Sequence, residues 1–211
     1  FLGFQYDDGF VVAPATRRAI ENGAIRWRER DVYEIVQGLR AAAFGLPFLP
    51  APGGEGSDYR RVNETPVLRG PDGDETLIAP AIRPEVALIH AQEADREGNL
   101  AVSDLFAEDL LARASARVVA TVERLVEAID RPAIPGTLVD TIAVVPGGAF
   151  PASCHRFHPF SAAHLRAYLA SASEDRVTEY LGCFVTGVED HAAFLRAAGG
   201  PGTWRAALRP A

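Results

Sequence analysis

The sequence predicts an α/β protein: a mostly parallel sheet covered by helices, followed by a helical C-terminal tail. Two observations carry this prediction. Up to position 145, short apolar runs typical of buried strands alternate with amphipathic helical segments, a pattern typical of parallel sheets. From 161 to 198 the spacing of apolar residues becomes helical throughout. We therefore expect an α/β domain over 1–150 and a helical segment over 151–211 that packs on the same domain.

The N-terminal part of the chain is expected to begin with short elements and to continue into a loop. Strands and helices are expected in turn at 1–5, 13–21, 24–29 and 31–43. Asp31 and Glu34 form the D-x-x-E pattern of a capping box at the start of the last helix. Gly45 and Pro47 end that helix. Positions 50–75 are rich in Gly, Pro, Asp and Asn without apolar periodicity, which predicts a long loop.

The middle of the chain contains the clearest strand signal. The continuous apolar run at 86–90 is typical of a strand that is covered on both faces. A turn is expected at 95–99 and an amphipathic helix at 104–115. Further strands are expected at 118–122 and 139–145. These elements make up the centre of the predicted sheet.

Composition excludes several classes of function. A formal net charge of −7 argues against unaided binding to nucleic acid or to an anionic membrane. No apolar run approaches the ~20 residues that span a bilayer. Cys154 and Cys183 match no redox spacing and are interpreted as free thiols of a reducing compartment. We therefore expect a cytoplasmic protein. The chain has no methionine and begins at Phe1 inside an apolar run, so we also expect that an N-terminal part is missing.

Motifs for metals and cofactors are absent from the sequence. His155 and His158 lie beside Cys154, but a metal site needs three or four converging ligands, and a polar loop is the favoured interpretation. No Walker loop, G-x-G-x-x-G motif or nucleophile elbow occurs. We expect neither a metal nor a tightly bound cofactor.

Gly98 and Asn99 follow directly on the buried strand predicted at 86–90 and the residues after it. Ligands of open α/β sheets collect at the carboxyl ends of strands. Gly98 would let a ligand approach the backbone, and Asn99 offers an amide donor. A plain Asp/Gly/Asn turn is the alternative interpretation.

Two other candidate groups lie earlier in the chain. Glu29 ends a predicted short strand, where a carboxylate can act as nucleophile or general base. Arginines at 26, 28 and 30 surround it, so a surface ion pair is the alternative. Gly56, Ser57 and Asp58 lie in the long loop and can wrap an acyl group or a diphosphate, although any surface loop has this composition.

Several short motifs, in their order and spacing, resemble the A subunits of glutaconate-type family I coenzyme A transferases over nearly the whole chain. They are GLRAAA and LPFLP at 38–50, GSD at 56–58, PEVALIH and AD-x-x-GN at 84–99, VERLV at 122–126, IPG and VD at 134–140, and PGGAFP at 146–151. The segment at 84–99 is the most specific of these.

The resemblance implies a CoA-transferase (NagB-like) fold and a known chemistry. In that family a glutamate attacks an acyl-CoA, an acyl anhydride and a glutamyl-CoA thioester follow, and CoA moves to a second carboxylate. In most members that glutamate belongs to the B subunit. The resemblance therefore implies a heterodimer or heterotetramer with a B subunit, with CoA thioesters as substrates. Here Gly56, Ser57, Asp58, Gly98 and Asn99 would line the shared cleft.

A branch of the family supplies the alternative function. This chain also resembles that branch, whose members are hydrolases of steroid-ring-derived acyl-CoA and use a glutamate of the A subunit. Glu29 matches the position of that glutamate. The sequence departs from that branch at 32–34, where Val-Tyr-Glu replaces a more polar segment with glycine. A non-catalytic subunit that only holds a partner is the third hypothesis.

Overall fold

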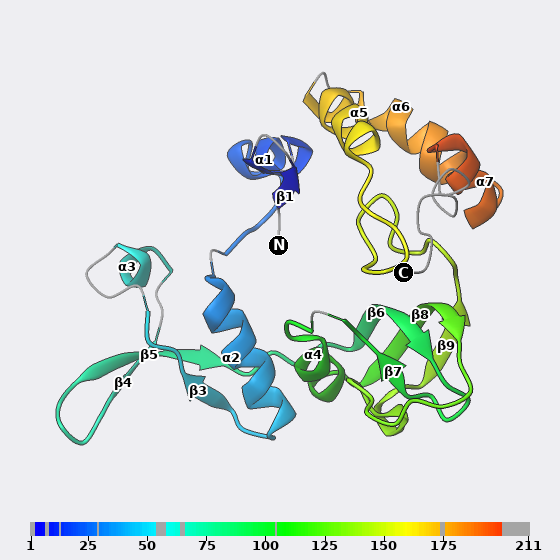
Figure 1. Cartoon of the computed structure of the whole chain (residues 1–211). Coiled ribbons are helices and arrows are strands. Elements are labelled where there is room, and N and C mark those ends of the chain that lie inside the picture. The colour runs from blue at the N-terminus through cyan, green and yellow to red at the C-terminus, as the bar shows by residue number, and fades with distance from the viewer. Residues whose placement is uncertain are drawn as a thin grey trace. The chain divides into compact units, whose positions relative to one another are not determined.

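The structure is a computed structural model that describes residues 3–6, 9–12, 14–28, 30–53, 58–63, 66–103, 105–173 and 176–199. Figure 1 shows the chain coloured by residue number. It divides into two compact units, one spanning 28–144 and one combining 1–27 with 145–211. Each unit is described by itself.

A four-stranded mixed sheet forms the centre of the 28–144 unit. Its strand order is β7 (Leu100–Ala101), β6 (Val86–Ala94), β8 (Arg117–Leu125) and β9 (Thr141–Val144). β8 pairs in parallel with both β6 and β9, and the short β7 is antiparallel to β6. The predicted α/β fold with parallel strands is confirmed.

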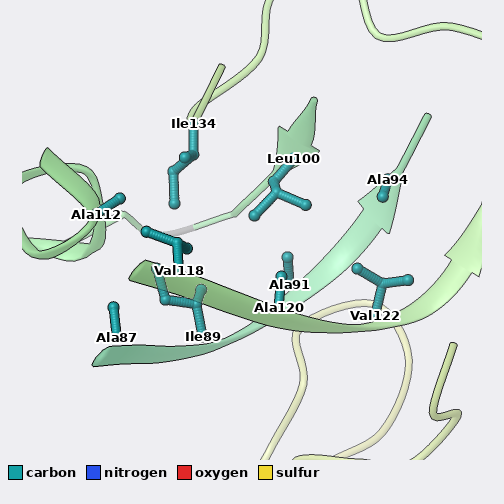
Figure 2. Close-up of a cluster of buried hydrophobic side chains, with 10 residues drawn as sticks. All are labelled: Ala87, Ile89, Ala91, Ala94, Leu100, Ala112, Val118, Ala120, Val122 and Ile134. Carbon is teal, nitrogen blue, oxygen red and sulfur yellow. The ribbon is translucent and has the colours of Figure 1, made fainter. Parts of the chain in front are cut away.

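The hydrophobic core of this unit lies on one face of the sheet. Figure 2 shows its ten buried side chains, which come from β6, β7, β8, α4 (Glu108–Ala114) and the segment around Ile134. Leu100, Val118, Val122 and Ile134 are the largest fully buried side chains among the described residues. Each buried aliphatic side chain of this size stabilises the fold by roughly 1.5–3 kcal/mol. Alanines make up much of the rest of the cluster, which leaves room for close packing.

The opposite face of β6 is exposed at the start of the strand and half-buried at His90 and Gln92, so the predicted coverage of both faces is wrong for the first residues of the strand. Ala87, Ile89 and Ala91 are buried, whereas Val86 is 47% exposed and Leu88 is 76% exposed. The apolar run indicates a strand that favours burial, but its composition does not say which surface supplies the cover.

A capped helix, α2 (Val32–Ala43), packs against α4 and against a second sheet of order β3 (Phe48–Pro50), β5 (Glu75–Pro80) and β4 (Val67–Arg69). Asp31 Oδ1 accepts a hydrogen bond of 2.8 Å from the backbone N–H of Glu34, which confirms Asp31 as the N-cap. The reciprocal half of the predicted capping box is not formed, because the N–H of Asp31 donates to the hydroxyl of Tyr59 instead. Gly45 follows the helix with φ +70°, as expected for a residue that ends it.

The predicted long loop at 50–75 is wrong. This segment contains α3 (Tyr59–Asn63), β4 and the first residue of β5. β4 has only three residues, too few to show an alternation in the sequence. Its hydrogen-bonded partner in β5 comes from a later stretch, so only pairing reveals the strand.

The predicted strand at 24–29 is also not found in its described residues, 24–28. The preceding helix, α1 (Pro14–Glu21), ends in a turn around Gly23, which has φ +69°. The N–H of Ala24 donates to the carbonyl of Ala19 at 2.8 Å, so this residue closes the helix end.

The other unit combines α1 and a short hairpin with a helical C-terminal part. β1 (Gly3–Tyr6) and β2 (Gly9–Val12) pair antiparallel; only the first was predicted. The C-terminal part comprises α5 (Ala162–Ser173), α6 (Val177–Leu181), a π-helical turn at Gly182–Thr186 and α7 (His191–Ala197). The predicted helical tail is confirmed. None of the helices that the structure describes is both long and apolar enough to span a membrane.

An aromatic cluster holds these C-terminal helices together. The ring of His164 lies 4.8 Å from that of Phe184 and 6.1 Å from that of Phe194, and its Nε2 lies 2.6 Å from the hydroxyl of Tyr180. Edge-on aromatic pairs of this kind stabilise beyond their buried area. Burial lowers the pKa of His164, which favours the neutral imidazole within the cluster.

Gly38 lets α2 lie directly on the chain that leaves β5. A Cβ at this position would lie 2.8 Å from both Cγ1 of Ile82 and the carbonyl oxygen of Pro80. The carbonyl of Gly38 also accepts a hydrogen bond of 2.9 Å from the N–H of Ile82. The helix and this segment therefore touch backbone to backbone.

We predict that Gly38→Ala destabilises the protein, because the added methyl group must push α2 away from Pro80. Overpacking of this kind costs about 1–3 kcal/mol. The unfolding midpoint in denaturant measures the loss. Gly182→Ala is the control, since nothing lies within 4 Å of a Cβ there and its backbone is helical. Equal stability of the Gly38→Ala variant and wild type would contradict the close packing.

Candidate functional site

The predicted site residues fall in two regions, and three of them lie outside the described residues: Glu29, Gly56 and Ser57. Asp58 precedes α3 and forms an exposed ion pair with Arg61, with Oδ2 3.1 Å from Nη2. A pair so open to solvent contributes little to stability.

The turn after β6 is built around the buried carboxylate of Asp95. Its oxygens accept hydrogen bonds of 3.0 Å from the backbone N–H groups of Glu97, Asn99 and Ile129. The side-chain amide of Asn99 donates a further bond of 2.9 Å. That amide bond is the main reason why the pKa of Asp95 lies below its ordinary value, and the backbone donors add to it.

Asn99 connects this turn to the segment before β9. Its Oδ1 accepts a hydrogen bond of 2.9 Å from the N–H of Gly136, while its Nδ2 donates to Asp95. An amide nitrogen carries two hydrogens, and the bond to Asp95 uses one of them. Asn99 therefore holds the turn in place and keeps one amide hydrogen as the candidate donor to a ligand.

Gly98 is required by the close contact between two backbones. It has φ +87°, and a Cβ on it would lie 3.3 Å from Cα of Gly136. A Cβ on Gly136 would lie only 2.1 Å from the carbonyl oxygen of Glu97. The sequence predicted that a ligand approaches the backbone at Gly98. On the side that faces Gly136, the protein's own backbone makes this close approach.

A shallow pocket of about 370 Å³ lies beside this turn. It is lined by residues 95–98, Leu125 and residues from 139–144. Ala94 and Leu125 end the parallel strands β6 and β8 at the same edge of the sheet. The structure thus places Asp95 and Gly98 where ligands of open α/β sheets collect.

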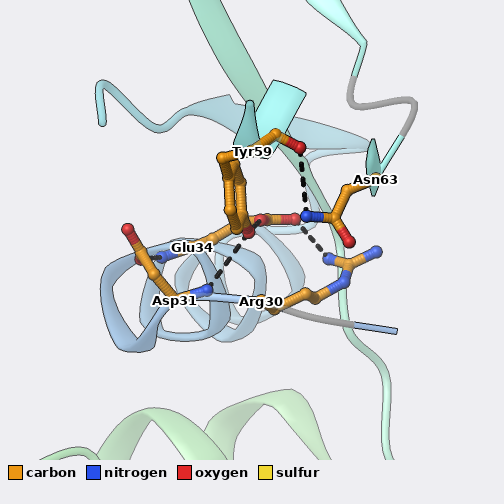
Figure 3. Close-up of polar contacts among 5 residues, drawn as sticks. All are labelled: Arg30, Asp31, Glu34, Tyr59 and Asn63. Carbon is orange, nitrogen blue, oxygen red and sulfur yellow. Dashed lines mark hydrogen bonds and ion pairs between the residues drawn. The ribbon is translucent and has the colours of Figure 1, made fainter. Parts of the chain in front are cut away.

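A second polar cluster lies at the start of α2, shown in Figure 3. Glu34 is buried, and its Oε1 lies 2.9 Å from Nη1 of Arg30 in an ion pair. Its Oε2 accepts a hydrogen bond from the hydroxyl of Tyr59. That hydroxyl also accepts a bond of 3.1 Å from the N–H of Asp31. Asn63 Nδ2 donates to the carbonyl of Tyr59 at 3.1 Å, a bond within the single turn of α3.

Burial raises the pKa of Tyr59 to about 12, and the hydrogen bond to Glu34 contributes to the rise. The phenol therefore stays protonated at neutral pH and serves as a donor to Glu34. Sequence reasoning identified Glu34 only as part of a capping box and missed Tyr59. No local pattern connects residues that lie 25 positions apart.

A third polar contact, also missed from the sequence, lies on the face of the central sheet opposite the Ala87, Ile89 and Ala91 side chains. Nδ1 of His90 lies 2.8 Å from the hydroxyl of Thr121, and its Nε2 lies 3.1 Å from Oε1 of the buried Glu123. His90 and Thr121 are direct partners in the β6–β8 register, which explains the contact.

Taken together, the parallel strands, the ordered turn and the edge pocket define an α/β protein with a pocket at the carboxyl edge of its sheet, where ligands of this fold class collect. A family model described as Coenzyme A transferase matches residues 8–144. The chain belongs to this family.

Named relatives agree with this assignment. A chain in the crystal structure of a cysteine-to-serine variant of the decarboxylase AibA/AibB is 40% identical, with a TM-score of 0.80, 88% of this chain covered and 71% of that one. The cholesterol ring-cleaving hydrolase IpdA subunit of Rhodococcus jostii is 34% identical, covering 71% of this chain and 57% of its own. The A subunit of the 3-oxoadipate CoA-transferase of Pseudomonas knackmussii is 28% identical, with 84% and 67% covered.

The resemblance to CoA-transferase A subunits seen in the sequence is thereby confirmed. The chain spans 44% to 67% of the length of the curated relatives that it matches.

We predict that the Asp95 carboxylate makes the free energy of unfolding depend on pH in the acidic range. Because its folded pKa is lowered, its contribution is fully present above the ordinary value of 3.8 and is lost as the pH falls through the folded pKa. The difference in unfolding free energy between wild type and Asp95→Asn should therefore be largest near neutral pH and shrink below pH 3.8. Asp72→Asn, at an exposed turn, is the control. A difference that does not change with pH would contradict this role.

Proposed function

We propose that this chain forms part of the A subunit of an enzyme that moves CoA between an acyl-CoA and a carboxylic acid. The observation that carries the proposal is the family match over residues 8–144. The relative named as part of a 3-oxoadipate CoA-transferase supports it over most of the chain.

In this proposal the nucleophilic glutamate belongs to a B subunit, and the A subunit shapes the cleft. Gly56, Ser57, Asp58, Gly98 and Asn99 are the proposed cleft residues. The second amide hydrogen of Asn99 would donate to an acyl oxygen, whose negative charge grows during attack on the thioester. Asp95 fixes the orientation of that amide in advance.

The chemistry needs no resident cofactor, because the CoA thioester itself activates the acyl group. Attack by the glutamate would break the thioester and release CoA as a thiolate, leaving an acyl anhydride. The thiolate would then attack the glutamyl carbonyl, free the first carboxylate and form the glutamyl-CoA thioester. The second carboxylate would then attack the glutamyl-CoA thioester and release the CoA thiolate, leaving a second anhydride. Attack of that thiolate on the acceptor's carbonyl would form the new acyl-CoA and free the glutamate, with no net change in oxidation state.

A B subunit is the proposed partner, in a heterodimer or heterotetramer. Two of the relatives are named as subunits, which supports a two-subunit enzyme. The exposed Val86 and Leu88 on one face of β6 add support, because adjacent exposed apolar side chains mark surfaces that another surface covers.

A second candidate function is hydrolysis of a cyclic, steroid-ring-derived acyl-CoA, with Glu29 as base or nucleophile. Identities of 34% and 37% to relatives named as cholesterol ring-cleaving hydrolase IpdA subunits favour it. The departure at 32–34 weighs against it, because Val-Tyr-Glu stands there in place of the more polar, glycine-containing segment of that branch.

We predict that Glu29→Ala separates the two functions in the complex of the full-length protein with its B subunit. The complex is incubated with a panel of acyl-CoA thioesters, with and without acetate or succinate, and CoA is followed by mass. CoA on the acceptor in wild type and variant alike is the outcome expected for the transferase. The control is Glu21→Ala, which removes an exposed carboxylate paired with Arg17.

Two other outcomes would overturn the transferase. Free CoA or ring-opened product without any acceptor, abolished by Glu29→Ala, would place the catalytic group in this chain and favour the hydrolase. Carbon dioxide released in the same reactions would favour a decarboxylase, and it is measured because one relative belongs to such an enzyme.

We also predict that the full-length protein aggregates when it is produced by itself and stays in solution when it is co-expressed with its B subunit. Subunit interfaces of obligate complexes are apolar and often bury more than ~2,000 Å². Size-exclusion chromatography of both preparations checks this. A monodisperse monomer in the preparation without the B subunit would contradict an obligate partner.

A further inference from the structure

We propose that Tyr59 and Glu34 are positioning residues, which join the start of α3 to the start of α2 and thereby hold Asp58, the proposed cleft residue next to Tyr59. The inference rests on the proposed function. It concerns side chains that neither the family resemblance nor the sequence patterns singled out for this role.

A single hydroxyl group, that of Tyr59, joins α3 to the start of α2. The Tyr59 hydroxyl accepts from the backbone N–H of Asp31 and donates to the carboxylate of Glu34. Its two partners are the N-cap residue of α2 and a residue of the first helical turn. The first residue of α3 is therefore bonded to two points on α2.

The charged groups of the cluster strengthen this contact between α3 and α2. Arg30 pairs with Oε1 of Glu34, and Oε2 receives the Tyr59 hydroxyl, so both carboxylate oxygens are engaged. Hydrogen bonds that involve an ionised partner are roughly twice as strong as neutral ones. Glu34 is also 6% exposed, so water competes little for these bonds.

The end of β3 is hydrogen-bonded to the same helix. Nε2 of Gln37, one turn further along α2, donates to the carbonyl of Pro50 at 2.7 Å. Arg40 donates in turn to the Oε1 of Gln37 and orients the amide. Two buried side chains of α2, Glu34 and Gln37, therefore hold the start of α3 and the end of β3.

These attachments flank the proposed site residues in the chain. Tyr59 directly follows Asp58, and Arg30 directly follows Glu29. A group that reacts or binds must be held close to its productive position, because a displacement of ~1 Å can lower a rate by on the order of 100-fold. Loosening the Tyr59–Glu34 bond would therefore reduce turnover before it unfolds the protein.

The test uses Tyr59→Phe in the full-length complex with its B subunit. This change keeps the ring and removes only the hydroxyl. We expect kcat of whichever CoA-thioester reaction the wild type catalyses to fall about tenfold, with a melting temperature near that of wild type. Glu34→Gln should lower kcat in the same direction, because a neutral amide pairs less well with Arg30.

Tyr33→Phe is the matched control. Tyr33 lies in the first turn of the same helix but is 47% exposed, so its hydroxyl can be lost without weakening the contact between α3 and α2. A lower melting temperature of Tyr59→Phe with an unchanged kcat would show a structural role only and would overturn the proposal. The same kcat and melting temperature in all variants would overturn it as well.

Hydrogen exchange separates this inference from the proposed function. A wild-type complex that is inactive on the whole panel contradicts the proposed function by itself. In either case, Tyr59→Phe should increase amide exchange both in the first turns of α2 and in α3, because one bond joins them. An increase confined to α3 would mean that the two segments are not coupled, and the positioning role would fail.

Discussion

The parallel pairing of β6 with β8 is the constraint on which the site region depends. Its register runs from Val86 with Arg117 to Ala94 with Leu125, so both strands end at one edge of the sheet. A parallel pair needs a crossover, and here it contains β7 and α4. The crossover covers one face of the sheet, and the Asp95 turn begins where the first strand ends.

Buried carboxylates organise both candidate regions in the same way. Asp95 receives three backbone donors and one amide donor, and Glu34 receives a guanidinium and a phenol. A carboxylate with its oxygens engaged is held in one orientation, and it cannot readily leave its partners, because a buried charge without them is costly. Each of the two fixes neighbouring groups and is poorly suited to attack a substrate itself. The catalytic group is better sought beside these carboxylates or in a second subunit.

Membership of the Coenzyme A transferase family limits the chemistry without choosing among its branches. Relatives of comparable identity are named as parts of a CoA transferase, a ring-cleaving hydrolase and a decarboxylase. One fold therefore serves several reactions, as expected when function depends on a few groups placed on a common scaffold. In the proposed function, Glu29 and a B subunit are the groups that would decide between these reactions.

The sequence by itself determined the elements whose signal is local. The N-cap at Asp31, the helix that follows it, the strands predicted at 86–90 and 118–122 and the turn with Gly98 all follow from spacing within a few residues. The ordered series of short motifs also sufficed to indicate the family. Local spacing is enough here because capping and amphipathic patterns are interactions between near neighbours.

Only the tertiary structure decided the contacts between distant positions. Part of the β3–β5–β4 sheet lies where a loop was predicted. The side chain of Tyr59 contacts Glu34, and that of His90 contacts Glu123. The partners in the two side-chain contacts lie 25 and 33 positions apart, so no periodicity in the sequence links them. Leu88 is exposed for a related reason: composition favours its burial, but a separate surface must supply the cover. Packing decides such contacts, because it depends on which elements come together and not on the order of residues within each.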